Sequence, residues 1–136
     1  MTAREMLESY GALLSRDAAL IRERKACLAH ARNGPENAEH WIRRAKSLQA
    51  ERNRVQRQLA RRLRELRLML ATLEDPALGE LLALRYLSLM SYEDISEEMG
   101  FSLRHIYRLH LRAVALLEEG RRAAAQNSAL SPKERV

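Results

Sequence analysis

Pairs of apolar residues recur every seven positions in the first part of the chain. The pairs are Met6-Leu7, Leu13-Leu14, Leu20-Ile21 and Cys27-Leu28. A strict seven-residue repeat keeps an apolar seam facing a partner helix. The pattern therefore predicts one helix from about Ala3 to Ala31. Tyr10 extends the seam, whereas Asp17 and Arg24 make it partly polar.

A second and longer seam follows the helix breakers Asn33, Gly34 and Pro35 and runs from about Glu36 to Leu73. Its positions are spaced alternately by four and three: Trp41, Ala45, Leu48, Arg52, Val55, Leu59, Arg62, Leu66, Met69 and Leu73. Two long amphipathic helices joined by a short loop predict an antiparallel, coiled-coil-like helical hairpin. Because a hairpin alone buries little, we expect it to pack against a second copy or the C-terminal domain.

Asp75 and Pro76 mark the predicted start of a separate domain. Asp75 suits the N-cap of a new helix, and Pro76 suits its first helical position. The short apolar helix that follows carries Leu78, Leu81, Leu82, Leu84 and Tyr86. We therefore assign residues 1–74 to the hairpin, 75–120 to a second domain and 121–136 to a flexible tail.

Two helix-start signals separated by a glycine lie within this second domain. Ser91 caps a short helix, Tyr92 to Met99, and Gly100 supplies a left-handed turn with Phe101 filling its corner. Ser102 then caps a last helix that runs to about Glu119. This layout is typical of a helix-turn-helix, in which the second helix enters the major groove of DNA.

The last helix is predicted to be two-sided. Ile106, Leu109, Ala113, Leu116 and Leu117 share an inner face, and His110 falls at the edge of the outer one. The candidate DNA-binding residues are Ser102, Leu103, Arg104, His105, Tyr107, Arg108, Leu111 and Arg112. Arg104 and Arg108 suit guanine, Arg112 suits a phosphate, and Tyr107 suits stacking or a thymine methyl. The alternative is that these are ordinary residues of a solvated surface.

Charge and composition narrow the class of protein. Few glycines and prolines, and no runs of β-branched residues, predict an all-α fold. The net charge of +6 indicates a polyanionic partner. It is concentrated in residues 41–74, which hold ten basic and three acidic residues. The arginines there fit a solvated surface, a phosphate-contacting stripe or a dock for an acidic protein, and spacing does not choose among them.

Catalytic and metal chemistry find no support in the chain. Cys27 is the only cysteine, which excludes an internal disulfide and a cysteine zinc site. His105 and His110 lie five residues apart, on nearly opposite faces of a helix, and no ligand set has zinc spacing. We therefore expect no enzyme activity, no cofactor and no metal. The apolar runs are too short to cross a bilayer, so we expect a cytoplasmic protein with no membrane partner.

The stretch from Leu84 to Leu117, LRYLSLMSYEDISEEMGFSLRHIYRLHLRAVALL, resembles the promoter-binding region four of sigma factors. The chain is similar more closely to phage and prophage regulators of late transcription of the ArpU and RinA type. The resemblance implies that Leu103, Arg104 and Tyr107 read the promoter, together with Arg108. It also makes RNA polymerase a candidate partner, although the sigma regions that melt promoters or bind the polymerase clamp have no counterpart in this sequence.

The sequence therefore predicts a non-enzymatic, sequence-specific DNA-binding regulator of transcription. Residues 102–119 would form its recognition helix on double-stranded DNA, and the hairpin would make a homo-oligomer, most simply a dimer. Two alternatives stay open. One is a small terminase subunit that recognises phage DNA for packaging, and the other is a coiled-coil interaction adaptor without DNA binding.

Overall fold

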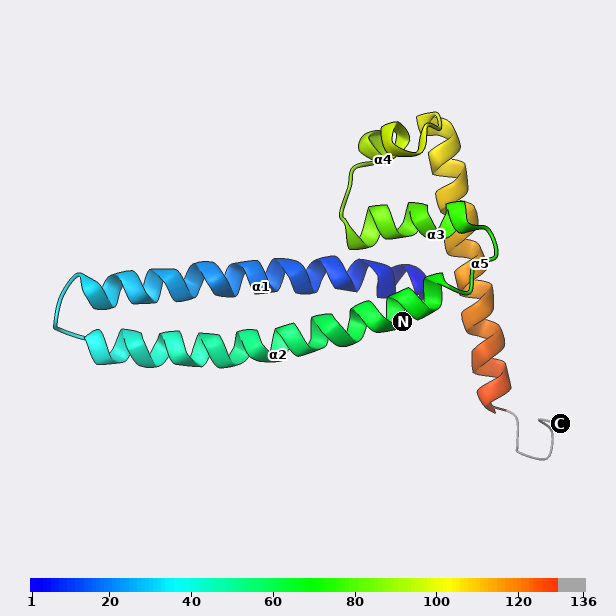
Figure 1. Cartoon of the computed structure of the whole chain (residues 1–136). Coiled ribbons are helices and arrows are strands. Elements are labelled where there is room, and N and C mark those ends of the chain that lie inside the picture. Colours follow the sequence, from blue (N-terminus) through cyan, green and yellow to red (C-terminus); the bar gives the residue numbers. More distant parts are fainter. Residues whose placement is uncertain (130–136) are drawn as a thin grey trace. The chain divides into compact units, whose positions relative to one another are not determined.

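The computed structural model describes residues 1–129, and every regular element among them is helical, as the sequence predicts. The elements are α1 (Ala3–Arg32), α2 (Ala38–Leu70), α3 (Pro76–Leu82), the π-helical η1 (Ala83–Leu87), α4 (Tyr92–Met99) and α5 (Leu103–Ala129) (Figure 1). None of these helices is long and apolar enough to pass through a bilayer. The chain divides into a two-helix unit, residues 10–63, and a C-terminal unit, residues 1–9 with 64–129.

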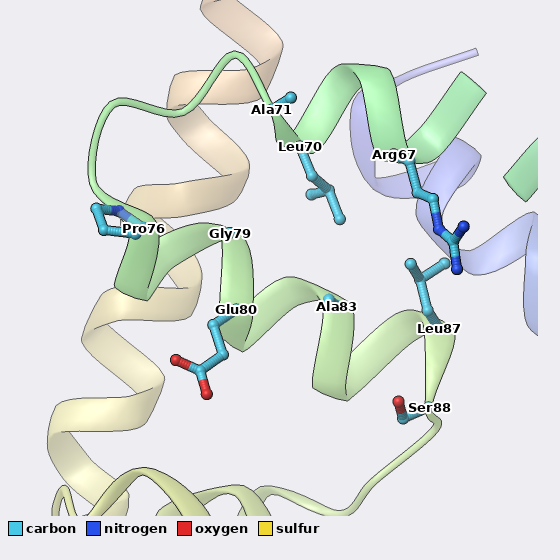
Figure 2. A pocket seen from close by; sticks show the side chains of 9 residues that line it. All are labelled: Arg67, Leu70, Ala71, Pro76, Gly79, Glu80, Ala83, Leu87 and Ser88. Carbon is cyan, nitrogen blue, oxygen red and sulfur yellow. The ribbon is translucent and has the colours of Figure 1, made fainter. Parts of the chain in front are cut away.

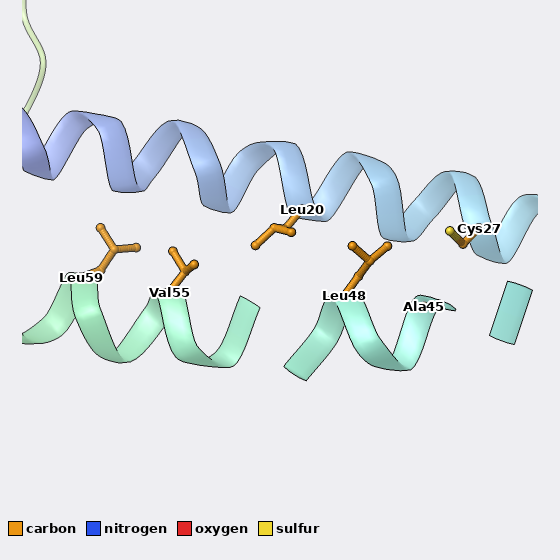
Figure 3. Packing of buried hydrophobic residues seen from close by; sticks show 6 residues of the cluster. All are labelled: Leu20, Cys27, Ala45, Leu48, Val55 and Leu59. Carbon is orange, nitrogen blue, oxygen red and sulfur yellow. The ribbon is translucent and has the colours of Figure 1, made fainter. Parts of the chain in front are cut away.

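The two-helix unit is held by one narrow apolar seam between α1 and α2. Leu20 and Cys27 of α1 meet four residues of α2: Ala45, Leu48, Val55 and Leu59 (Figure 3). The helices run antiparallel, because Arg16 pairs with Glu51 whereas the later Glu23 pairs with the earlier Arg44. The seam predicted from the seven-residue repeat is thus the buried contact of this unit.

The polar residues in the seam are partners of each other. Nε of Arg52 donates a hydrogen bond to Oδ1 of Asp17 over 3.0 Å. The Asp17 side chain is only 13% exposed and that of Arg52 is 32% exposed. A carboxylate and a guanidinium at this depth are tolerated because each satisfies the other. The pair also opposes register slip, since a shift of one turn would separate the two charges.

Both ends of α2 differ from the predicted bounds for local reasons. The helix begins at Ala38 rather than Glu36, because Asn37 adopts a left-handed conformation with φ of 67°. It ends at Leu70 rather than Leu73, where the backbone tightens into a turn. In that turn the amides of Thr72 and Leu73 bond to carbonyls only three residues back, over 3.1 and 3.2 Å.

Helix α3 of the C-terminal unit begins at the predicted cap. Oδ1 of Asp75 accepts a hydrogen bond of 3.0 Å from the Ala77 amide, and Pro76 opens α3. After Leu82 the backbone widens into η1, in which the Ser88 amide bonds to the Ala83 carbonyl five residues back. The sequence pattern did not predict this π-helical stretch.

Two serine caps and one left-handed glycine, all predicted from the sequence, define the ends of α4 and the start of α5. Oγ of Ser91 accepts from the Asp94 amide over 3.1 Å, and Oγ of Ser102 accepts from the His105 amide over 3.2 Å. Between them Gly100 takes the predicted left-handed conformation, with φ of 73°. Three fully buried residues pack together beneath the turn between α4 and α5: Leu81 of α3, Ile95 of α4 and Ile106 of α5.

Helix α5 does not end near Glu119 but continues to Ala129. The predicted flexible tail is therefore helical over residues 121–129, and its remainder lies outside the described residues. Gly120 weakens the helix, but the following Arg-Arg-Ala-Ala-Ala-Gln consists of good helix formers that carry it on.

The first turns of α1 belong to the C-terminal unit. Ala3 and Leu7 are completely buried there. The Ala3 amide, one of the unpaired donors at the start of a helix, bonds to Oε2 of Glu118 on α5 over 2.7 Å. Arg121 adds hydrogen bonds to the Met6 sulfur and the Met1 carbonyl. Contacts between the first residues of the chain and α5 thus complete this unit.

Two glycines of this unit should respond in opposite ways to alanine. Gly100→Ala forces a side chain into the left-handed region and should cost about 1–2 kcal/mol. Gly120→Ala meets nothing within 4 Å inside a helix and should stabilise by about 0.5–1 kcal/mol. Thermal unfolding followed by circular dichroism compares them. Equal shifts in melting temperature would contradict the assigned turn geometry.

Candidate nucleic-acid interface

The eight candidate DNA-binding residues all come from α5 and its cap. Seven of them are exposed, and Leu103 is half-buried. The set is Ser102, Leu103, Arg104, His105, Tyr107, Arg108, Leu111 and Arg112. The structure brings them together on the outer side of the first turns of α5, where the Ser102 cap fixes the start of the helix.

Three arginines form a ladder along this outer side. Arg104, Arg108 and Arg112 are four residues apart, so each successive Cα rises by about 6 Å along the axis. All three are exposed, and within residues 1–129 no hydrogen bond or ion pair engages any of them. Guanidinium groups held on one helix without an internal partner are available to an external acceptor, and guanine and phosphate offer the bidentate geometry they match.

Apolar and aromatic side chains stand beside the ladder. Leu111 is 66% exposed and Tyr107 is 43% exposed. The Tyr107 ring lies against Tyr92 with ring centroids 4.9 Å apart, which limits its rotamers. An outer surface that mixes arginines with exposed apolar groups suits base edges and thymine methyls.

Phe101 does not fill the turn as predicted. It is 36% exposed, and its ring meets the edge of His105 at a centroid distance of 4.9 Å. The corner is filled instead by the buried Ile95 and Ile106. These two β-branched residues suffice because Gly100 lets the backbone reverse without inserting a side chain.

The inner face of α5 also differs from the prediction in two places. Its buried residues are Ile106, His110, Ala113 and Leu117, spaced by four, three and four. His110, predicted at the edge of the outer face, is only 4% exposed, whereas Leu116, predicted to pack inward, is 39% exposed. The spacing of residues would have predicted a buried His110, because this residue continues the stripe through Ile106 and Ala113. The prediction placed it outside because histidine is polar.

His110 is buried because polar partners surround it. Its Nε2 shares a hydrogen bond of 2.7 Å with the Tyr86 hydroxyl, and the Tyr92 hydroxyl lies 3.5 Å away. Arg85 covers the Tyr92 ring at 4.1 Å and donates to the Met90 carbonyl over 3.0 Å. The contacts join η1, α4 and α5, so that α5 is held in one rotation about its own axis, with its arginines outward.

The pKa values of His110 and Tyr86 are displaced from their ordinary ranges. Burial lowers the pKa of His110, and the positive charges of Arg4 and Arg85 lower it further. Burial also raises the pKa of the Tyr86 hydroxyl. Both shifts favour the neutral forms of the His110 ring and the Tyr86 hydroxyl, which cost least in a partly apolar interior.

Helix α4 has the opposite charge from the ladder. It exposes Glu93, Asp94, Glu97 and Glu98 and contains no basic residue. Carboxylates repel phosphates, so any attraction of this region for a polyanion must come from α5.

The described residues form no cluster that could hold a metal ion, and one hollow of the C-terminal unit lacks the features of a ligand pocket. Within residues 1–129 no three His, Cys, Asp or Glu side chains are placed to hold a metal ion. One hollow in the C-terminal unit separates the last turns of α2 from α3 and η1 (Figure 2). Arg67 reaches across it toward Leu87, but Glu80 points away, and its lining is otherwise mostly apolar. Ligand pockets normally have several polar groups that converge on one point, and this hollow does not.

No family model matches the chain, and no curated protein or solved structure matches it either.

Replacement of His110 should reduce the sensitivity of stability to acid. A lowered folded pKa means that the unfolded chain binds the proton more readily, so stability is full above about pH 6.5 and is lost as pH falls. His110→Gln retains an acceptor for Tyr86 but removes this titration. Its melting temperature should therefore differ less between pH 8 and pH 5.5, as about one proton fewer is linked to unfolding.

The exposed His105, on the same helix, provides the matched control. His105→Gln should keep the full acid sensitivity of the unmodified chain. If the two variants show the same pH dependence, the buried histidine does not control it.

Proposed function

We propose that the protein is a sequence-specific DNA-binding regulator of transcription. In this proposal α4, the Gly100 turn and α5 act as a helix-turn-helix of the sigma region-four kind. The observation that carries it is the unpaired ladder of Arg104, Arg108 and Arg112, which lies opposite the buried stripe of the same helix. The resemblance of residues 84–117 to sigma factors and phage late-transcription regulators supports the same interpretation.

The dimensions of the ladder fit the major groove. Arg104 and Arg112 are eight residues apart, about 12 Å along the helix axis, which is about the width of the groove. With the start of α5 inserted, Arg104 and Arg108 each pair with the two acceptors of a guanine, and Arg112 contacts a phosphate. Tyr107 and Leu111 offer contact surface for thymine methyls.

In this proposal, helices α5 and α2 contribute differently to DNA binding because their surroundings differ in charge. The acidic surface of α4 gives no bulk attraction to phosphate, so base contacts by α5 must supply discrimination. The exposed arginines of α2, among them Arg54, Arg57 and Arg61, supply affinity that does not depend on sequence. A chain that reads promoters in this way acts as an activator or accessory regulator, with RNA polymerase as a second partner.

Loss of the reading arginines should weaken binding selectively. Genomic fragments that the protein retains are first selected and sequenced, and the shared site is used for titration. Arg104→Ala or Arg108→Ala should each cost about 1–3 kcal/mol on that site and relax discrimination at one base pair. Arg122→Ala, an exposed arginine near the other end of α5, is the matched control and should have no effect on specificity.

Unchanged specific binding by the Arg104/Arg108 double variant would refute α5 as the reading helix. Retention of no fragment at moderate salt would refute DNA binding as a whole and favour an interaction adaptor.

The arginines of α2 should affect all DNA alike. Arg57→Gln with Arg61→Gln should weaken specific and non-specific duplexes by the same factor. The slope of log affinity against log salt should become shallower by about 0.9 for each phosphate that the variant no longer neutralises. A weakening confined to the specific site would show instead that these residues read bases.

A further inference from the structure

The two flanks of the two-helix unit differ in charge. The innermost seam positions of α1 are Tyr10, Leu13, Asp17, Leu20, Arg24 and Cys27, and those of α2 are the seam residues from Trp41 to Arg62 named above. The residues that directly follow these positions form one flank, which we call the uncharged flank. On α1 these are Gly11, Leu14, Ala18, Ile21, Lys25 and Leu28, and on α2 they are Ile42, Lys46, Gln49, Asn53, Gln56, Ala60 and Leu63. Its only charged members, Lys25 and Lys46, lie toward the loop that joins the helices, and the rest of the flank is apolar, small or amide-bearing.

Helix geometry places all of these residues on one side of the unit. Each follows its seam residue by about 100° of rotation. Because α1 and α2 are right-handed and run antiparallel, this rotation brings the flank residues of both helices to the same side of the plane that contains the two helix axes. The observed ion pairs confirm the geometry for the other side. Arg16, Glu23, Arg44 and Glu51 each directly precede a seam residue, and they pair across the helices as Arg16 with Glu51 and Glu23 with Arg44.

Large apolar side chains remain incompletely covered on the uncharged flank. Ile42 is 42% exposed, and Leu14, Ile21, Leu28 and Leu63 are half-buried. The seam alone buries only six residues completely or nearly so. A second layer of helices on this flank would bury the remaining apolar stripe, as in a four-helix bundle.

We infer that the uncharged flank is the surface through which two copies of the chain pair, so that two units form a four-helix core. The charge of the unit selects this occupant. Residues 10–63 hold 13 basic and 5 acidic residues, a net charge of +8. An acidic protein or DNA would be drawn to the arginines elsewhere on the unit, and a basic partner would be repelled. Two copies can meet closely only where this charge is sparse, and that surface is the uncharged flank, whose charged members are Lys25 and Lys46 alone.

The available area is enough for a stable pair. Each helix contributes about 35 Å of length to the unit and is about 10 Å wide, so the two-helix face covers about 700 Å². A standard interface buries about 800 Å² per partner.

A two-fold axis parallel to the helices suits this pairing. It places each α1 beside an α2 of the other copy, so that adjacent helices of the four-helix core run antiparallel. The inference concerns residues 10–63 alone and does not rest on DNA binding.

Solution mass and two charge-inserting variants test the pairing. The full chain, without DNA, should have twice its 15.7 kDa mass by light scattering or sedimentation at micromolar concentration. Ile21→Glu places a carboxylate in the middle of the flank and should raise the dimer dissociation constant at least about tenfold. Circular dichroism checks that this variant keeps its helices.

Two glutamines on α2 give a matched pair that alters charge without altering shape. Gln56 lies on the uncharged flank and Gln58, two residues on, lies on the ion-paired flank, and both are exposed. Gln56→Glu should shift the chain toward monomer, whereas Gln58→Glu should leave the dissociation constant unchanged.

A monomeric unmodified chain would overturn the inference and leave the flank to a different protein. A mass above two chains would overturn it too, as would equal effects of the two glutamine variants. Because none of these measurements includes DNA, they separate failure of the pairing surface from failure of the proposed function.

Discussion

Burial of one stripe of α5 is the constraint from which the rest of the C-terminal unit follows. Ile106 is inaccessible against Leu81 and Ile95, and the stripe continues through His110 to Leu117. Burial of one face of the helix determines which face is exposed to solvent, and here the exposed face carries the arginine ladder. The hydrogen bond between His110 and Tyr86 also restricts rotation of α5 about its own axis, because apolar contacts alone would tolerate small rotations.

Charge is distributed unevenly between the two units. The two-helix unit carries a net charge of +8, whereas α4 is acidic and α5 shows isolated arginines. Under the proposed function, the basic unit provides attraction that salt screens, and α5 provides contacts that depend on the base sequence. Excess positive charge also hinders self-association, which makes the placement of uncharged residues as informative as the placement of arginines.

Polar residues inside the seams have a common explanation. Asp17 and Arg52 interrupt the apolar repeat of the two-helix unit, and His110 interrupts that of α5. Each has a partner within hydrogen-bond distance, and no buried side-chain polar atom among the described residues lacks one. Such pairs add little net stability, but they penalise any register in which they separate. They specify which packing is reached, while the leucines supply most of its driving force.

The sequence by itself determined whatever a few neighbouring residues can encode. The caps at Asp75, Ser91 and Ser102, the left-handed Gly100 and the seven-residue seam all act within one or two turns, and all were predictable. Tertiary structure decided the rest. It buried His110, exposed Phe101, widened η1 and joined Ala3 to Glu118 on α5. Each of these outcomes depends on partners distant in sequence, whose free energy of burial overrides local preference.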